Sequence, residues 1–562
     1  MSDILLINFK RLGDIYSSAH LIQSIVTKDP STKVSILVFK EFELAARSIK
    51  NVANVYTVNR KEIETLKKNR IYSNGFALNS FFDDINDIAN LKWDQVINYS
   101  NDRLSTYLTS LLTIGSKPEY AGIRFTKRQT VEYSSIWSII FNDVLTSYKY
   151  TPVNFNDAYH HLIGAQFQIS EDSIKTNAKY NESAFKNFTQ LREAEARSGN
   201  QIKLVGIQLK TSRASKDIPM ETLTVLVNKI LDCPELYPIL LVAPSQEEKA
   251  IANKINEHFD NSLVSVEADL KALPSVLINL DLVITPDTLT KHMADLVDTP
   301  VIEGSLGEAP LFKQATVNPQ SIVLSVDPAL REFSVKKTDS DLIWKNQNKM
   351  IEAADILSAV FYLLNENTAL NLGQRVCAYQ PVRDGLGYRL KLIAGESDPQ
   401  WELARQLGRC YMMKSLTGLK TDEIFSDLVE LPRQQIRKWL DGEKAKVSEA
   451  SKNLLGAIRS LLQAGENSAK GGDFVRSLDK LLLSSETDSL VSLPSLWFRA
   501  NIESLNSTTL EENIKEVEGL LYKLKGEYQK VFDLLKDFEN FANKERILRA
   551  TQNPTPSEVA PA

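Results

Sequence analysis

The first 170 residues alternate short apolar runs with segments of helical periodicity. Uninterrupted apolar runs are typical of strands that are buried on both faces of a parallel sheet. Between the first two runs, residues 14–26 place Ile15, Ala19, Ile22 and Val26 on one helical face. This rhythm predicts a doubly wound parallel sheet over residues 1–170. The expected strands are residues 4–7, 34–39, 55–58 and 95–99.

The same alternation returns further along the chain and predicts a second α/β domain over residues 201–365. A polar, helix-friendly segment at 171–200 carries little strand pattern and is expected to connect the two domains. The strands of the second domain are expected at 203–208, 239–242, 263–266, 282–285 and 300–302, and its helices at 220–231, 247–259 and 351–364.

Beyond residue 384 the strand patterns end, and a helical extension is predicted over 384–550. Apolar residues spaced alternately by three and four form a heptad seam over 510–538, which could pair with another copy or pack within the chain. Leu520, Phe532 and Leu534 widen the apolar stripe and favour packing within the chain. The tail 551–562 is rich in proline (Pro554, Pro556 and Pro561) and is expected to be disordered. The seam residues are Leu510, Ile514, Val517, Leu521, Leu524, Tyr528, Val531, Leu535 and Phe538.

Length and composition narrow the class of protein. A chain of 562 residues is too long for one hydrophobic core, and domain-size statistics suggest about three or four domains. The composition, 43% apolar and 24% charged, is that of an ordinary globular protein. Three widely spaced cysteines indicate a reducing compartment rather than a disulfide framework or a metal site. No apolar run approaches the roughly 18–20 residues that span a bilayer. We therefore expect a cytoplasmic protein.

One helical segment has a nucleic-acid interpretation. Residues 433–442 resemble the recognition helix of phage-repressor helix-turn-helix domains, whose basic face enters the major groove. The net charge of −5 gives the chain no general attraction for polyanions. Nucleic acid is therefore not expected as a partner, and a helical interaction domain is favoured.

Two loops that carry acidic residues follow predicted strands. Gly13 and Asp14 follow the strand at 4–7, and Asp287, Thr288 and His292 follow the strand at 282–285. Ligands of parallel α/β sheets bind beyond the carboxyl ends of the strands. The two loops could therefore face each other across a cleft between two domains, an arrangement that suits group transfer between two substrates.

Several segments, in order along residues 3–330, resemble motifs of glycosyltransferase family 9, which includes the lipopolysaccharide heptosyltransferases. The resemblance implies a GT-B fold, in which two Rossmann-like doubly wound domains face a cleft, here followed by an all-α C-terminal domain. It also implies that the first domain binds the acceptor and the second binds the nucleotide sugar. The segments are 4–7 with Leu12-Gly13-Asp14-Ile15, Trp93-Asp94-Gln95-Val96-Ile97-Asn98, Tyr120-Ala121-Gly122, residues 211–219, residues 243–248 and Asp287-Thr288-Leu289-Thr290-Lys291-His292.

The resemblance also implies roles for individual residues. Asp14 would be the general base, and Lys216 would neutralise the departing diphosphate, since enzymes of this kind bind no metal. The donor would be a nucleotide sugar, with ADP-heptose indicated, and no cofactor is implied. A plainer interpretation stays open at each position. Asp14 and Asp287 could merely cap the helices that follow them, and residues 211–216 could form a solvated polar loop. The remaining donor-binding candidates are Thr211, Ser212, Arg213, Glu247 (or Glu248), Asp287, Thr288 and His292.

Some positions depart from the family pattern. Leu289 stands where the family has a glycine that lets the backbone approach the donor, and Ile218 replaces a tryptophan. Glu303 and Glu308 bring two additional acids toward the expected diphosphate site. A non-catalytic GT-B scaffold, whose helical region binds partners, is therefore the alternative to an active enzyme.

An active enzyme would be metal-independent and inverting, with a glycolipid or protein as acceptor. It could act as a peripheral protein at the inner membrane. The helical extension could dock a protein acceptor or drive homo-oligomerisation.

Overall fold

The computed structural model describes residues 2–68, 73–100, 102–115, 118–142, 148–165, 173–196, 201–335, 340–364, 368–466, 471–505 and 509–552. The chain forms two compact units. The first comprises Met1–Lys127 and Val153–Ser397, and holds both large sheets. The second comprises Arg128–Pro152 and Asp398–Ala562, and is mainly helical.

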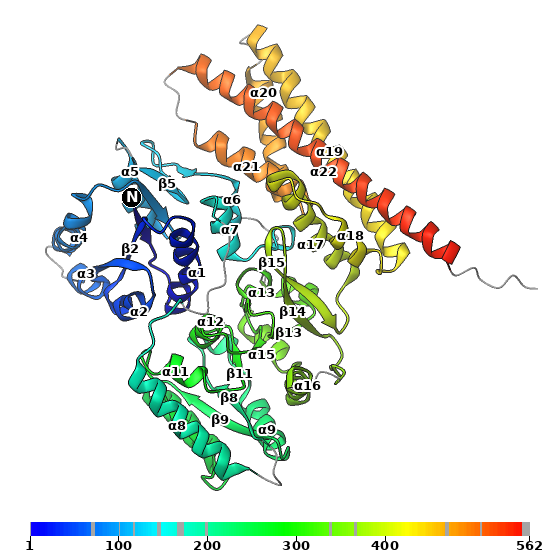
Figure 1. Ribbon diagram of the computed structural model, residues 1–562. Coiled ribbons are helices and arrows are strands. Elements are labelled where there is room, and N and C mark those ends of the chain that lie inside the picture. Colours follow the sequence, from blue (N-terminus) through cyan, green and yellow to red (C-terminus); the bar gives the residue numbers. More distant parts are fainter. Residues whose placement is uncertain are drawn as a thin grey trace, which may run out of the picture. The chain divides into compact units, whose positions relative to one another are not determined.

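The N-terminal sheet of the first unit has five strands in the order β3-β2-β1-β4-β5. Figure 1 labels two of them, β2 and β5. All neighbouring strands run parallel. Leu5, Ile7, Leu37 and Val96 are fully buried in one core cluster, because apolar residues on these strands are covered by the helices that connect them. The strands are β1 (Asp3–Ile7), β2 (Lys33–Phe39), β3 (Val52–Val58), β4 (Gln95–Asn98) and β5 (Glu119–Ala121).

The second sheet has eight strands in the order β10-β9-β8-β11-β12-β13-β14-β15. The first six run parallel and the last two form an antiparallel hairpin at one edge. The strands are β8 (Lys203–Gln208), β9 (Leu236–Val242), β10 (Val264–Glu267), β11 (Leu282–Pro286), β12 (Val301–Gly304), β13 (Ile322–Val326), β14 (Val376–Asp384) and β15 (Gly387–Ala394).

The hairpin of β14 and β15 extends this sheet past residue 365, where the sequence pattern places the end of the domain, and past residue 384, where it places the start of the helical region. A contact far along the chain holds the hairpin turn: the Asp157 carboxylate accepts the Tyr388 backbone N–H at 2.7 Å. Gly387 has φ +119°, and a Cβ there would lie 2.2 Å from the Asp157 carboxyl carbon. Local periodicity does not reveal such a contact, which explains the shifted boundary.

Helices and short strands complete the first unit. Within the expected connection 171–200, α8 (Ala178–Glu195) contacts α11 and places Arg192 at 2.8 Å from Asp281, so this helix packs on the second sheet's domain. The others are α1 (Leu12–Lys28), η1 (Lys40–Phe42), α2 (Glu43–Ser48), α3 (Arg60–Lys67), α4 (Ser73–Ala89), α5 (Arg103–Thr113), β6 (Ile123–Phe125), α7 (Phe155–Leu162), η3 (Ala214–Lys216), α9 (Met220–Leu231), α10 (Gln246–Glu257), α11 (Leu273–Leu277), α12 (Leu289–Leu296), α13 (Leu311–Gln314), α14 (Pro328–Val335), α15 (Ser340–Asn348) and α16 (Ala353–Leu364).

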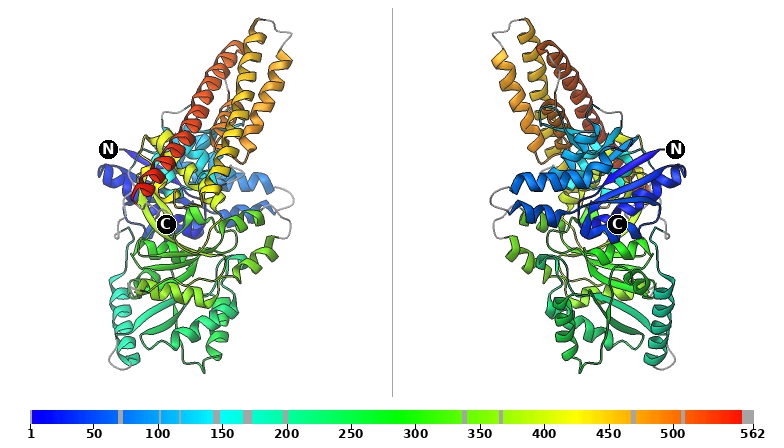
Figure 2. Two further views of the ribbon diagram at one scale, coloured as in Figure 1. Left: turned by 90° about the vertical axis from the view of Figure 1, so that its right-hand side faces the viewer. Right: turned by 90° about the vertical axis from the view of Figure 1, so that its left-hand side faces the viewer.

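The second unit is a bundle dominated by two long helices, α19 (Arg433–Glu466) and α22 (Leu510–Gln552), which lie side by side in all views (Figures 1 and 2). Residues 433–442, with their resemblance to a DNA-recognition helix, form the first turns of α19, where Ile436 and Leu440 are buried. The other elements are β7 (Val131–Tyr133), α6 (Ile136–Asn142), η2 (Tyr148–Tyr150), α17 (Pro399–Met412), a π-helical turn η4 (Met413–Thr417), α18 (Asp422–Leu428), α20 (Gly471–Leu482), η6 (Leu483–Glu486) and α21 (Ser492–Glu503).

The heptad seam lies on α22 and packs within the second unit. Leu521, Leu524 and Val531 are fully buried, and α22 contacts both α19 and α21. The Tyr528 hydroxyl lies 2.7 Å from the Ser495 hydroxyl of α21. This arrangement corresponds to the alternative in which the seam packs inside its own chain. The expected disordered tail begins at residue 551, but α22 continues to Gln552, and residues 553–562 lie outside the described residues.

The architecture confirms the predicted fold class, with two doubly wound parallel α/β sheets followed by a helical region. Among the described residues, none of the helices combines the length and the apolar character that crossing a membrane requires.

Truncation of one seam residue tests the internal packing of α22. Leu524→Ala should lower the stability of the helical unit by about 2–5 kcal/mol, because it leaves a cavity in a packed core. Ile514→Ala, at a seam position that is 41% exposed, is the matched control and should change stability by about 0.5 kcal/mol or less. Urea-induced loss of helicity, followed by circular dichroism, measures both. Equal losses for the two variants would contradict the packing.

Candidate active site

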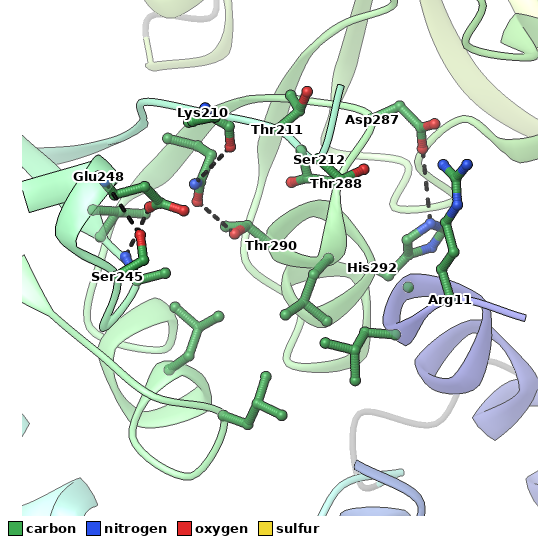
Figure 3. Close-up of a pocket in the computed structure, with 18 of the residues that line it drawn as sticks. Arg11, Lys210, Thr211, Ser212, Ser245, Glu248, Asp287, Thr288, Thr290 and His292 are labelled. Atoms are coloured by element: carbon green, nitrogen blue, oxygen red, sulfur yellow. Dashed lines mark hydrogen bonds and ion pairs between the residues drawn. The ribbon is translucent and has the colours of Figure 1, made fainter. Parts of the chain in front are cut away.

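A cavity of about 1080 Å³ opens in the first unit, beyond the carboxyl ends of its strands. Its wall is made by the loops that follow β1, β2, β8, β9, β10, β11 and β12, so both sheets contribute to it. Figure 3 shows several of these side chains around the space. All nine candidate residues from the sequence lie in this wall: Asp14, Thr211, Ser212, Arg213, Lys216, Glu247, Asp287, Thr288 and His292.

Gly13 allows the N-terminal domain to approach the loop after β11. A Cβ on Gly13 would lie 2.8 Å from Cδ2 of His292, closer than real Cβ contacts come. The start of α1 therefore touches α12 directly. Absence of a side chain at residue 13 is what brings Asp14 beside the residues of the second sheet.

Asp14 is half-buried and its carboxylate accepts two hydrogen bonds. The Arg11 backbone N–H lies 3.3 Å from Oδ2, and the Gln314 side-chain amide donates to Oδ1 at 3.0 Å. Gln314 ends α13 and comes from the other domain, so this bond bridges the cleft. Sequence reasoning did not single out Gln314, because no motif marks it and its partner is 300 residues away.

The Asp287 carboxylate is buried between two ammonium groups. Lys291 Nζ lies 2.7 Å from Oδ1, and Lys216 Nζ lies 3.0 Å from Oδ2. Burial alone would raise the pKa of Asp287, but Lys291 and Lys216 together lower it well below its ordinary value. His292 Nε2 is 3.8 Å from Oδ1 (Figure 3). Burial and the nearby Lys291 lower the pKa of His292 well below its ordinary value, so this imidazole is neutral at neutral pH.

The loop after β8 is fixed by its own hydrogen bonds. The Thr211 hydroxyl donates to the Arg213 carbonyl at 2.6 Å, and the Thr211 N–H donates to Asp217 Oδ1 at 2.7 Å. Arg213 pairs with Glu308 at 2.7 Å, so one of the candidate cations already faces an acid at the cavity wall. Lys216 is the buried cation of this loop that reaches the Asp287 carboxylate.

The two acids after β9 have different positions. Glu248 accepts the Ala243 N–H at 2.8 Å, while its own N–H donates to Ser245, the N-cap of α10, at 3.2 Å. Glu248 therefore holds the loop together. Glu247 is exposed and forms an ion pair with Lys210 at the cavity, which leaves it accessible to a ligand.

Residues of the loop after β11 complete the wall. The Thr288 and Thr285 hydroxyl oxygens are 3.1 Å apart, and Thr290 donates to Gln208 Oε1 at 2.6 Å. Leu289, which stands in place of a family glycine, is the first residue of α12 and lines the cavity. The first residues of α12 line the cavity, and the start of a helix stabilises an anion through its unpaired backbone N–H groups.

The two additional acids lie in different places. Glu308 lines the cavity, as expected. Glu303 lies behind it on β12, buried, where Oε2 accepts the Thr316 N–H at 2.7 Å and Oε1 is 3.8 Å from Lys291. Burial raises the pKa of Glu303 to about 7. Glu303 therefore faces a buried lysine and not the space where a diphosphate would lie.

Two doubly wound α/β domains that share a ligand-sized cavity at the carboxyl ends of their strands define the GT-B class of fold. Residues 90–325 match the model of glycosyltransferase family 9 (heptosyltransferase). The matched segment holds eight of the nine candidate residues, and Asp14 precedes it.

Individual relatives are distant. The chain is 25% identical over 279 residues to the lipopolysaccharide core heptosyltransferase OpsX of Haemophilus influenzae, which covers 46% of this chain and 74% of that protein. A glycosyltransferase family 9 structure from Veillonella parvula superposes with a TM-score of 0.46 and 15% identity, covering 65% of this chain and 98% of the other. The structure of the E. coli ADP-heptose lipopolysaccharide heptosyltransferase II superposes with a TM-score of 0.44 and 12% sequence identity. The match covers 65% of this chain and 100% of that chain.

The contact at Gly13 can be tested by a double-mutant cycle. Gly13→Ala should destabilise the protein by about 1–3 kcal/mol, because the new methyl group overlaps the His292 ring. The same change in a protein that carries His292→Ala should cost less, since the ring is gone. Gly75→Ala, at a helical glycine with open space around it, is the control and should be neutral or stabilising. Additive effects at residues 13 and 292, measured by thermal unfolding, would contradict the contact.

Proposed function

We propose that this chain is an active glycosyltransferase that moves a heptose-like sugar from a nucleotide diphosphate to an acceptor hydroxyl. One observation carries the proposal: a carboxylate from the first domain, Asp14, and an ammonium group from the second, Lys216, line the same cavity. Sugar transfer needs a base on the acceptor side and a cation on the leaving-group side. The family match and the heptosyltransferase relative support a heptose donor.

The proposed mechanism is a direct displacement with inversion at the anomeric carbon. Asp14 takes the proton of the acceptor hydroxyl while that oxygen attacks the anomeric carbon. The bond from this carbon to the diphosphate breaks, and the diphosphate leaves with the electron pair. Lys216 and the backbone amides at the start of α12 stabilise the charge that develops on it, with no metal ion in the scheme.

The other wall residues are proposed to position the donor. Thr288 and His292 lie at the same helix start as the amides and suit the diphosphate or the sugar. Ser212 lines the cavity beside Lys216, and Glu247 is placed to accept the ribose hydroxyls. We propose ADP-heptose as donor and a glycolipid or a protein as acceptor.

Nucleotide binding is the first test. ADP, GDP, UDP and ADP-heptose are each added to the purified protein, and the thermal unfolding midpoint is measured. One nucleotide class should raise the midpoint, and Lys216→Met should weaken that binding by about tenfold or more, the equivalent of one charged hydrogen bond. Lys203→Met is the matched control, since Lys203 pairs with Asp281 at 3.1 Å at the other end of β8, outside the cavity.

If no nucleotide at millimolar concentration stabilises the folded wild type, the non-catalytic GT-B scaffold becomes the better function. Leu289 in the cavity wall and the Arg213–Glu308 pair are the observations that favour it. Partner capture with the helical unit would then be compared between the full chain and variants of α19 and α22.

The general base is tested separately. Asp14→Asn keeps an oxygen that can accept from Gln314 but cannot take a proton, so kcat should fall by about 10²–10⁴ with donor affinity unchanged. Asp29→Asn, at the other end of α1, is the control and should leave turnover unaltered. Retention of wild-type kcat in Asp14→Asn would remove Asp14 from the mechanism.

A further inference from the structure

Asp287 holds two lysines that differ in their access to the cavity. Lys216, in η3, lines the cavity wall and reaches Oδ2 of Asp287. Lys291 lies on α12, four residues after Asp287. It is fully buried behind the cavity wall, and its ammonium group donates to Oδ1 of Asp287. The Asp287 carboxylate thus pairs with one lysine that a ligand in the cavity can contact, Lys216, and with one that it cannot contact, Lys291.

Lys291 is fixed on three sides. Besides Asp287, its ammonium group donates to the Gln314 backbone carbonyl and lies 3.8 Å from Glu303 Oε1. Burial by itself would lower the pKa of Lys291, but Asp287 and Glu303 raise it above its ordinary value. Lys291 is therefore a permanent buried cation in the middle of two acids.

This arrangement decides what Lys216 can do. A buried carboxylate that loses its last cationic partner is strongly unfavourable. If Lys216 were the sole partner of Asp287, movement of the Lys216 ammonium group to a diphosphate would leave the Asp287 carboxylate without a cation. Because Lys291 remains on Oδ1, the Lys216 ammonium group can move to a ligand while Asp287 stays neutralised.

We propose that Lys291 is a positioning residue that holds the charge of Asp287 and so frees Lys216 for the donor diphosphate. The inference rests on the proposed function and deepens it. Lys291 occupies a variable position of the motif that the sequence shares with family 9, and Glu303 is one of the acids that depart from the family pattern. The lysine at a variable position and the additional acid are explained together as a buried pair.

The same lysine also connects the two halves of the cleft. Its bond to the Gln314 carbonyl fixes the residue whose side-chain amide holds Asp14 Oδ1 at 3.0 Å. The path from Lys216 through Asp287, Lys291 and Gln314 to Asp14 is continuous, so the cation and the base are positioned by one network.

The experiment compares binding of a nucleoside diphosphate and of its nucleoside by calorimetry, using ADP, GDP or UDP, whichever stabilises the wild type. Lys291→Met should weaken diphosphate binding by about tenfold or more, because Asp287 then retains Lys216. Binding of the nucleoside, which has no phosphate, should be unchanged. Adding Asp287→Asn to Lys291→Met should raise diphosphate binding at least about threefold above that of Lys291→Met alone, since no carboxylate is left to hold Lys216.

Each other outcome overturns the inference. Unchanged diphosphate binding in Lys291→Met leaves the proposed function intact but refutes the role of Lys291. Equal loss of nucleoside and diphosphate, or no recovery in the double variant, shows a purely structural lysine. A wild type that binds no nucleotide refutes the inference and the proposed function together. If Lys291→Met does not fold, Lys291→Met with Glu303→Gln, which leaves no unpaired acid on β12, takes its place in every comparison.

Discussion

The buried carboxylate of Asp287 is the interaction on which the candidate site depends. A single acid at the carboxyl end of β11 holds Lys216 from the loop after β8 and Lys291 from α12. Because the two lysines come from different elements, the pairing sets the distance between the loop after β8 and the loop after β11, which line the same cavity. Removal of water from three charged groups is tolerated only because each has an opposite charge in contact.

The second constraint is the close approach of the two α/β domains within the first unit. Gly13 leaves room for the His292 ring, and the Gln314 amide reaches across to Asp14. These contacts put the Asp14 carboxylate and the Lys216 ammonium group in one cavity, although the two residues lie about 200 positions apart in sequence. Sheets of this kind collect loops at one edge, and the chemistry is decided by which side chains those loops carry.

Much of the site follows from the sequence, because the candidate residues lie directly after strands that the apolar pattern predicts. Position after a strand is enough to bring Lys216 and Asp287 to the same edge of the second sheet and Asp14 to the corresponding edge of the first. Gln314, Lys291 and the true place of Glu303 could not be found in this way. A lysine on a short helix and an acid on a strand have no local signature of pairing, and Glu303 faces inward, where Lys291 and the Thr316 N–H are its partners.

By itself the sequence determined the fold class, the strand–loop positions of the nine candidate residues and the helical nature of the C-terminal region. These properties depend on periodicity within a few residues of each other, which a linear pattern records. Tertiary structure alone decided that the α22 seam packs on α19 and α21, that β14 and β15 join the second sheet by pairing with β13, and that Lys291 forms an ion pair with Asp287. Each of these results depends on groups that are distant along the chain and become neighbours only when burial requires a partner for every apolar face and every charge.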